Sequence, residues 1–69
     1  IFAQLRSHIG EALQAAVQSG ELTGIDIDAT AQGMLAYFEG VMLLAKTQDD
    51  PAPLRDLLPA MAQIRIPAR

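Results

Sequence analysis

The sequence predicts an all-α fold, a small antiparallel unit of three helices within one domain covering residues 1–69. Apolar residues recur every three or four positions in three successive stretches, which is the spacing of one helix face. The composition agrees, because 51% of the residues are hydrophobic and only 4% are aromatic, as in bundles of Ala, Leu, Ile and Met. A chain of 69 residues forms at most one domain.

A core of this size is marginal, since a small domain buries a smaller fraction of its surface than a large one. The usual remedies are disulfides, a metal, or association with another chain. The chain has no cysteine, and its single histidine, His8, cannot form a metal site alone. Association with another chain is therefore the remaining remedy, and no cofactor or metal is predicted.

Charge and hydropathy exclude two classes of partner. The formal net charge is −3, and the five basic residues are scattered rather than clustered, so the chain itself is not expected to bind DNA. The longest apolar run, Val41 to Ala45, is far shorter than the roughly 20 residues that cross a bilayer. The chain begins at Ile1, already in helical phase and without methionine, and we interpret it as part of a longer protein.

The first helix is predicted over Ile1 to Ser19, where one apolar stripe faces a polar side. Gly20 follows at the position where a left-handed backbone favours glycine. Gly10 marks either a close approach of another backbone or, as we favour, a tolerated weak point. His8 is more readily explained as a residue at the edge of the apolar stripe than as a ligand.

The central helix is predicted over Asp28 to Thr47, after a connector that contains Gly24. Asp28 is the predicted N-cap, with Asp26 as the competing cap. Apolar and small residues occupy two adjoining faces, which predicts burial on most of the circumference. The side with Leu35, Phe38 and Met42 is expected to pack on the first helix. The side with Gly33, Tyr37 and Gly40 is left for the last helix and a second chain.

Gly33 and Gly40 lie seven residues apart on one row of the central helix, with Tyr37 between them. Each glycine costs about 1 kcal/mol relative to alanine, which is reasonable where another helix must approach the backbone. We favour close helix packing over neutral drift. Periodicity does not distinguish packing within the chain from packing between chains.

The last helix carries an apolar stripe of Leu54, Leu57, Leu58, Met61 and Ile64. Either Asp50 before Pro51 or Ala52 before Pro53 caps its start. Pro59 removes an N–H and clashes with the carbonyl four residues earlier, so a kink or break is expected near Arg55 to Leu58. Pro67 is expected to end the helix.

Several short motifs follow one another along the chain. They are Gly20-Glu21-Leu22, the Asp28 cap, Phe38-Glu39-Gly40-Val41 and Asp49-Asp50, followed by the leucine-rich last helix. This order resembles the C-terminal end of tetracycline-repressor (TetR) family regulators, and the resemblance covers nearly the whole chain. In that family an N-terminal helix-turn-helix domain binds operator DNA, and the C-terminal domain binds small molecules and dimerises.

The resemblance implies a cytoplasmic homodimer in which the last two long helices of each subunit form a four-helix bundle. DNA binding would belong to the N-terminal domain, which is missing from this sequence. The implied dimer interface comprises Gly33, Tyr37, Gly40, Val41, Leu44, Leu54, Leu57, Leu58 and Met61. Candidates for contact with a small-molecule effector are Met34, Phe38 and Met42, with Leu5 and Ile9 opposite. Such a stripe is more often plain core than a ligand pocket.

The sequence supports two other classes of function less well. A self-contained helical module that binds a partner helix in its groove is the alternative, and it would lack an upstream DNA-binding domain. An enzyme is disfavoured, because there is no cysteine, no base paired to a nucleophile and no glycine-rich phosphate loop. Ser7 and His8 are adjacent on one helix and therefore point about 100° apart.

Overall fold

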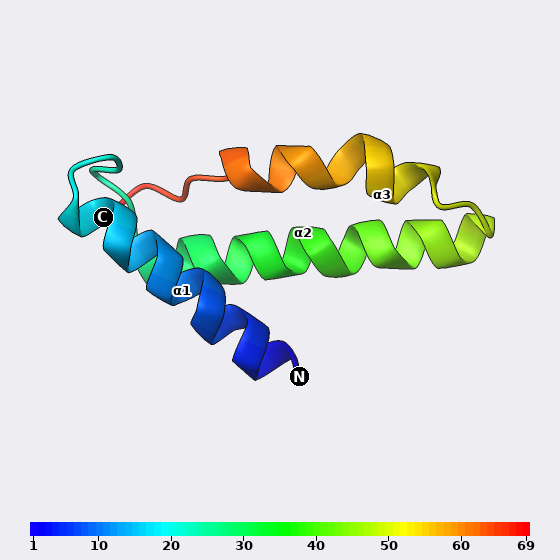
Figure 1. Ribbon diagram of the computed structural model, residues 1–69, viewed down its shortest axis with the longest axis horizontal. Helices are drawn as coiled ribbons and strands as arrows, with labels where there is room; N and C mark the ends of the chain where they lie inside the picture. The colour runs from blue at the N-terminus through cyan, green and yellow to red at the C-terminus, as the bar shows by residue number, and fades with distance from the viewer.

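The computed structural model describes all 69 residues, and its helical segments form an elongated unit of 40 × 22 × 20 Å (Figure 1). The elements in chain order are α1 (Phe2–Gln18), α2 (Ile27–Gln48), α3 (Ala52–Leu57) and the 3₁₀ helix η1 (Leu58–Gln63). In Figure 1 the last two elements run antiparallel to α2, and α1 crosses near the beginning of α2. The predicted all-α fold is confirmed.

The end of α1 is set by Gly20, as predicted. Its φ of +85° is the left-handed conformation that glycine adopts without a steric penalty. The Gly20 N–H donates to the carbonyl of Val17 at 3.1 Å, and the Glu21 N–H donates to the carbonyl of Ala16 at 2.9 Å. This pair of hydrogen bonds is a Schellman motif, which satisfies carbonyls left free at the end of a helix.

The N-cap of α2 is Asp26 rather than Asp28, so the preferred prediction was wrong. Asp26 has an extended backbone, and its Oδ1 accepts a hydrogen bond from the Ala29 N–H at 3.0 Å. Its own N–H donates to the carbonyl of Ile66 at 2.9 Å, and this long-range bond helps hold Asp26 outside the helix. Asp28 lies in the first turn, where a negative charge is favourable to the helix dipole.

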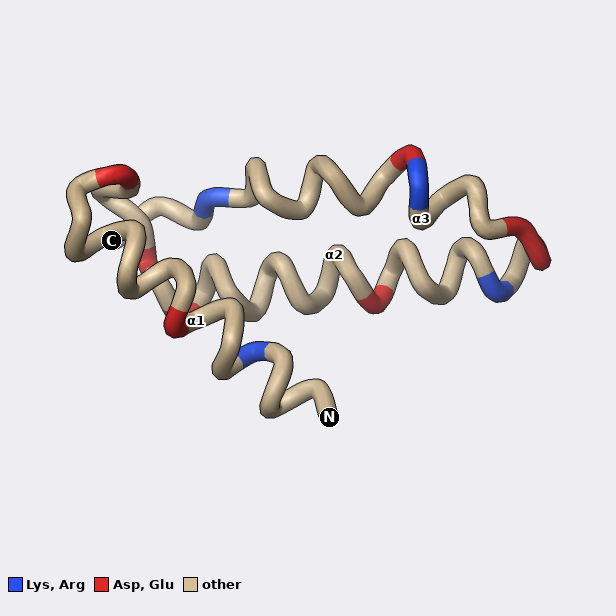
Figure 2. Tube along the Cα trace, in the orientation of Figure 1, with Lys and Arg blue, Asp and Glu red and all other residues tan.

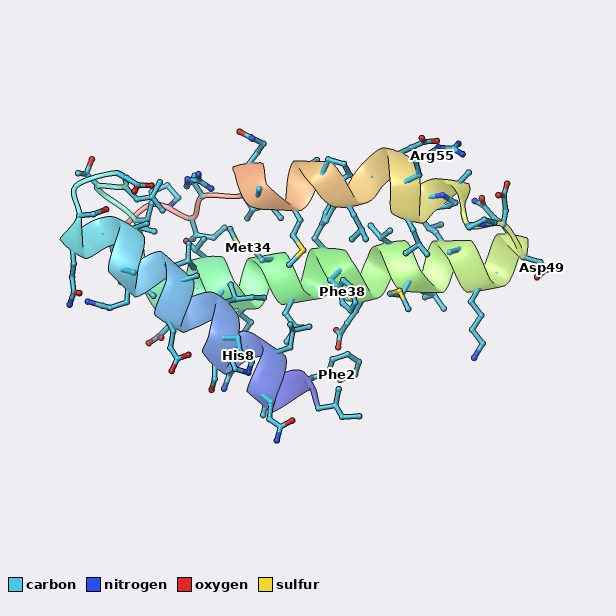
Figure 3. All side chains as sticks on the ribbon, in the orientation of Figure 1. Phe2, His8, Met34, Phe38, Asp49 and Arg55 are labelled. Carbon is cyan, nitrogen blue, oxygen red and sulfur yellow. The ribbon has the colours of Figure 1, made fainter.

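The turn between α2 and α3 contains two aspartates that have different structural roles. Asp49 has a φ of 52° and ends α2 in the left-handed conformation, and Figure 3 shows it at the far end of the molecule. The Asp50 Oδ1 accepts a hydrogen bond from the N–H of Ala52 at 2.9 Å, the first residue of α3. The N-cap position of α3 is nevertheless Pro51, so neither predicted cap, Asp50 or Ala52, occupies it.

The last helical segment changes from an α-helix to a 3₁₀ helix next to Pro59. The α-helix ends at Leu57 and continues as a 3₁₀ helix, so the break predicted near Arg55 to Leu58 is confirmed. The predicted end at Pro67 was wrong, because η1 ends at Gln63 and Ile64 is already extended, with a ψ of 129°. We call residues 64–69 the strap.

The strap folds back onto the start of α2 and the connector before it. The Ile66 N–H donates to the Thr30 Oγ1 at 3.0 Å, and the Thr30 hydroxyl lies 3.4 Å from the Ile66 carbonyl oxygen that accepts its proton. The Ala68 N–H donates to the carbonyl of Gly24 at 2.9 Å, and an isolated bridge pairs Ile25 with Pro67. Thr30 is completely buried, so both ends of its hydroxyl are used inside the protein.

The hydrophobic core lies where α1, the strap and the beginning of α2 converge. Its buried members are Leu13, Ala31 and Met34. Partly buried apolar residues surround them: Ile9, Leu22, Ile25, Ile27, Met61 and Ile64. The core therefore collects residues from every element except α3.

The second half of α2 is much less covered than the sequence predicted for this helix. Beyond Tyr37 the only buried residue is Val41, whereas Met42, Leu43 and Leu44 are 44%, 64% and 43% exposed. Within this chain α2 is thus not buried on most of its circumference. Figure 1 shows the reason, since α1 diverges from α2 toward its own N-terminus. Met42 is therefore less covered than expected.

Candidate functional site

An apolar surface lies open on the second half of α2 and on α3. We define this open face by Gly40, Leu43, Leu44 and Leu57, all of which are exposed. Leu43, Leu44 and Leu57 expose 64%, 43% and 37% of their surface. The hydroxyl of Tyr37 donates to the carbonyl of Leu57 at 2.7 Å and joins α2 to α3 beside this face.

The structure distributes the nine residues predicted for a dimer interface over different environments. Gly40, Leu44 and Leu57 are exposed, whereas Val41 is 3% exposed and already covered by its own chain. Gly33 faces the strap, because a Cβ built there would lie 3.6 Å from Ile64 Cγ2. The remaining four positions are half-buried along the last segment and beside it: Tyr37, Leu54, Leu58 and Met61.

A second feature is an apolar groove of about 440 Å³ between α1 and η1, which we call the α1–η1 groove. Met34 contributes to it from α2, and Figure 3 labels this residue near the crossing of α1 and α2. The α1 wall consists of Ile9, Ala12 and Leu13, and the opposite wall of Leu58, Pro59, Met61, Ala62 and Arg65. Arg65 is the only charged residue of the lining.

Two of the five residues predicted to contact an effector lie in this groove, namely Ile9 and Met34. Leu5, Phe38 and Met42 line none of the three surface hollows of the structure. Leu58 and Met61, predicted for the dimer interface, instead form part of the groove wall. The sequence analysis did not single out Ala12, Pro59 or Arg65 as site residues.

The other two hollows are more polar and lie along α1. One of about 550 Å³ includes Arg6, Glu11 and Asp28, and one of about 330 Å³ includes Phe2, Leu35 and Glu39. Neither gathers a set of groups with recognisable chemistry. No cluster of three or more His, Cys, Asp or Glu side chains could hold a metal ion.

Exposed charges form no extended patch. Figure 2 shows the basic residues separated along the chain, as their spacing in the sequence predicted. His8 and Glu11 approach to 3.7 Å on the surface of α1, and both side chains are more than three-quarters exposed. Such an exposed pair contributes little to stability. No helix combines the length and apolarity needed to span a membrane.

The fold is that of a small all-α domain whose helices leave an apolar face uncovered. The chain belongs to the family described as "Tetracyclin repressor-like, C-terminal domain", which matches residues 1–61. The resemblance predicted from the motifs is therefore confirmed. Domains of this family belong to transcription regulators rather than to enzymes. No individual curated protein and no solved structure matched the chain.

Proposed function

We propose that this chain is the dimerisation and effector-binding region of a one-component transcriptional regulator that acts in the cytoplasm. A helix-turn-helix domain outside this sequence would make the DNA contacts, in line with the acidic balance of the chain. The family match supports the general role. The single observation that carries the proposal is the open face.

The open face has the composition of a helix-pairing surface. Two exposed leucines of α2 flank the row that contains Gly40, and no atom beyond the local helix lies within 4 Å of a Cβ built at that glycine. A glycine in a helix costs about 1 kcal/mol, and the intramolecular packing gives no reason for it. A partner helix that approaches the backbone at Gly40 would supply the reason.

A symmetric dimer presents the same patch from both subunits. We place Gly40, Leu44 and Leu57 at the centre of this interface, with Tyr37 and Leu54 beside them. The α2–α3 pair of each subunit would then contribute to the four-helix bundle. Gly33 would remain under the strap, and Val41 would support the interface from within its own chain.

The effector would bind on a different side of α2. Met34, in the α1–η1 groove, and Gly40, on the open face, are six positions apart on the helix. At about 100° per residue, their side-chain directions differ by roughly 120°. The two surfaces can therefore be occupied together, and the last helical segment, which contributes to both, connects them.

The dimer is tested by the substitution Gly40→Leu, with Gly10→Leu as the matched control. Both glycines are helical and have open space at the Cβ position, but only Gly40 lies on the open face. Sedimentation equilibrium should show a dimer for the parent chain and for Gly10→Leu. Gly40→Leu should weaken dimerisation at least tenfold, about 1.4 kcal/mol, while the circular dichroism signal stays helical. A parent chain that is a folded monomer at micromolar concentration would refute the dimer.

A further inference from the structure

We propose that the α1–η1 groove binds an aliphatic monocarboxylate, with the hydrocarbon chain over Met34 and the carboxylate at Arg65. This inference rests on the proposed effector-binding function and names the chemical class of the effector. Three features of the groove carry it: an apolar aliphatic lining, a single cationic group, and a backbone anchor that holds this group in place.

The lining selects for a hydrocarbon body. Apart from Arg65, it consists of aliphatic and thioether side chains and one proline, with no aromatic ring. Met34 and Met61 lie on different elements, and their flexible side chains adapt to an alkyl chain. The volume of about 440 Å³ lies within the roughly 300–1,000 Å³ that small-molecule sites usually occupy.

Arg65 selects for a negative head group. Its Nη1 donates to the carbonyls of Ala62 at 2.7 Å and Ile64 at 2.8 Å, and these bonds leave Nε and Nη2 available. These two nitrogens form the edge of a guanidinium that binds a carboxylate through two parallel hydrogen bonds. Arg65 belongs to neither ion pair of the structure, and no acidic residue lines the groove.

The strap keeps this guanidinium at the groove. Ile66, the next residue, is fixed by its N–H bond to Thr30 Oγ1 at 3.0 Å, and Thr30 is completely buried. The arginine is therefore held between its own two backbone contacts and a buried anchor. Holding a binding group in place before the ligand arrives lowers the entropy that binding must remove.

The three methionines of the chain provide the readout. Met34 and Met61 line the groove, whereas Met42 is 44% exposed and lines no hollow. In a chain labelled with ¹³C at the methionine methyl groups, sodium decanoate below its micellar concentration should shift the Met34 and Met61 resonances in a saturable manner. The Met42 resonance should stay in place, and decyltrimethylammonium at equal concentration should leave all three unchanged.

Two pairs of variants separate the head-group contact from the hydrocarbon contact. Arg65→Gln should weaken decanoate binding about five- to tenfold, and Arg69→Gln, which changes an exposed arginine outside the groove, should not. Ala12→Leu places a larger side chain in the groove and should reduce binding at least tenfold, about 1.4 kcal/mol. Ala15→Leu, also exposed on α1 but outside the groove, is the control.

Three results would overturn the inference. These are no saturable shift at Met34 and Met61, an equal shift at Met42, or equal binding of the cationic and anionic decyl compounds. Oligomeric state is measured separately by sedimentation. A dimer without decanoate binding would reject the ligand class and leave the dimer standing, whereas a monomer that binds decanoate in the groove would reject the dimer alone.

Discussion

The two ends of α2 are covered very differently. At the first end, residues 27–34, the helix lies under α1, the connector and the strap, and it contains Thr30, Ala31 and Met34 as buried residues. At the second end, residues 40–48, only Val41 is buried, and three consecutive large apolar residues are exposed. We call these the closed end and the open end.

The comparison shows that one helix can be covered at one end and open at the other although both ends are rich in apolar residues. The closed end is stabilised by contacts within the chain, and changes there should affect folding. Changes at the open end should affect folding less, and its exposed apolar surface is the one proposed to meet a partner. The predictions below test this division, from the largest expected effect to the smallest.

The largest contrast is expected between two methionines of α2. Met34→Ala removes a side chain that is 7% exposed and should lower the free energy of unfolding by about 2–4 kcal/mol. Met42→Ala, at a residue 44% exposed, should lower it by less than about 1 kcal/mol. Urea unfolding followed by circular dichroism, at a concentration below that of dimer formation, measures both. Equal losses would show that the two ends are not separate.

The next largest effect concerns the anchor of the strap. Thr30→Val keeps the shape of the side chain but leaves the Ile66 N–H without its partner, which should cost about 1–3 kcal/mol. The Ile66 amide should then exchange with solvent faster than in the parent chain. Thr47→Val, at the exposed open end, is the control and should change neither quantity appreciably. Unchanged exchange at Ile66 in the Thr30 variant would mean that the strap does not depend on this hydroxyl.

A smaller effect distinguishes the two aspartates at the start of α2. Asp26→Ala removes the N-cap and should lower stability by about 0.5–2 kcal/mol. Asp28→Ala removes only a favourable charge in the first turn, worth a few tenths of a kcal/mol at an exposed position. Thermal unfolding of the two variants gives the order, and a reversed order would restore Asp28 as the cap.

The smallest effect is expected at the glycine under the strap. A Cβ at Gly33 would meet Ile64 and Ile66 at 3.6–3.7 Å, which is ordinary van der Waals contact. Gly33→Ala should therefore be neutral, or stabilising by up to about 1 kcal/mol through helix propensity. A loss of more than about 1 kcal/mol in urea unfolding would show that the strap requires the smaller residue.

Local patterns in the sequence predicted the elements well. The apolar spacing predicted α1 and α2 to within a residue or two, Gly20 predicted the end of α1, and Pro59 predicted the break after Leu57. Each of these depends on residues close together in the chain. The family was also predicted, because its motifs keep their order along the sequence.

The predictions from sequence were wrong where the structure depends on contacts between residues far apart in the chain. Asp28 was preferred over Asp26 as the cap, and the bond from Asp26 to Ile66, which favours Asp26, lies outside any local pattern. The apolar residues of the strap do not have the regular spacing of a helix or a strand, so no pattern in the sequence predicted its position. Burial of α2 was overestimated because periodicity shows which faces are apolar but not whether α1 stays beside them.

Only part of the candidate site was predicted, because some of its residues follow a local helical pattern and others do not. Ile9 and Met34 were identified because they lie on the inward faces of their helices. Arg65 was not predicted as a site residue, because its place at the groove depends on a strap that leaves the helix earlier than predicted. The assignment of individual residues to the dimer interface remains a prediction.

The strap also has a consequence for the order of folding. Thr30 and Ile66 are 36 residues apart in the sequence. Their pairing closes a ring of chain that contains most of α2, the α2–α3 turn, α3 and η1. Closing such a ring costs chain entropy that grows with the logarithm of its length, and the cost falls once the antiparallel helices have paired. We therefore expect the ring to close last. The family match ends at residue 61, before the strap begins, so a chain cut at that boundary would keep α1, α2 and α3 but lose the end of η1 and the closure.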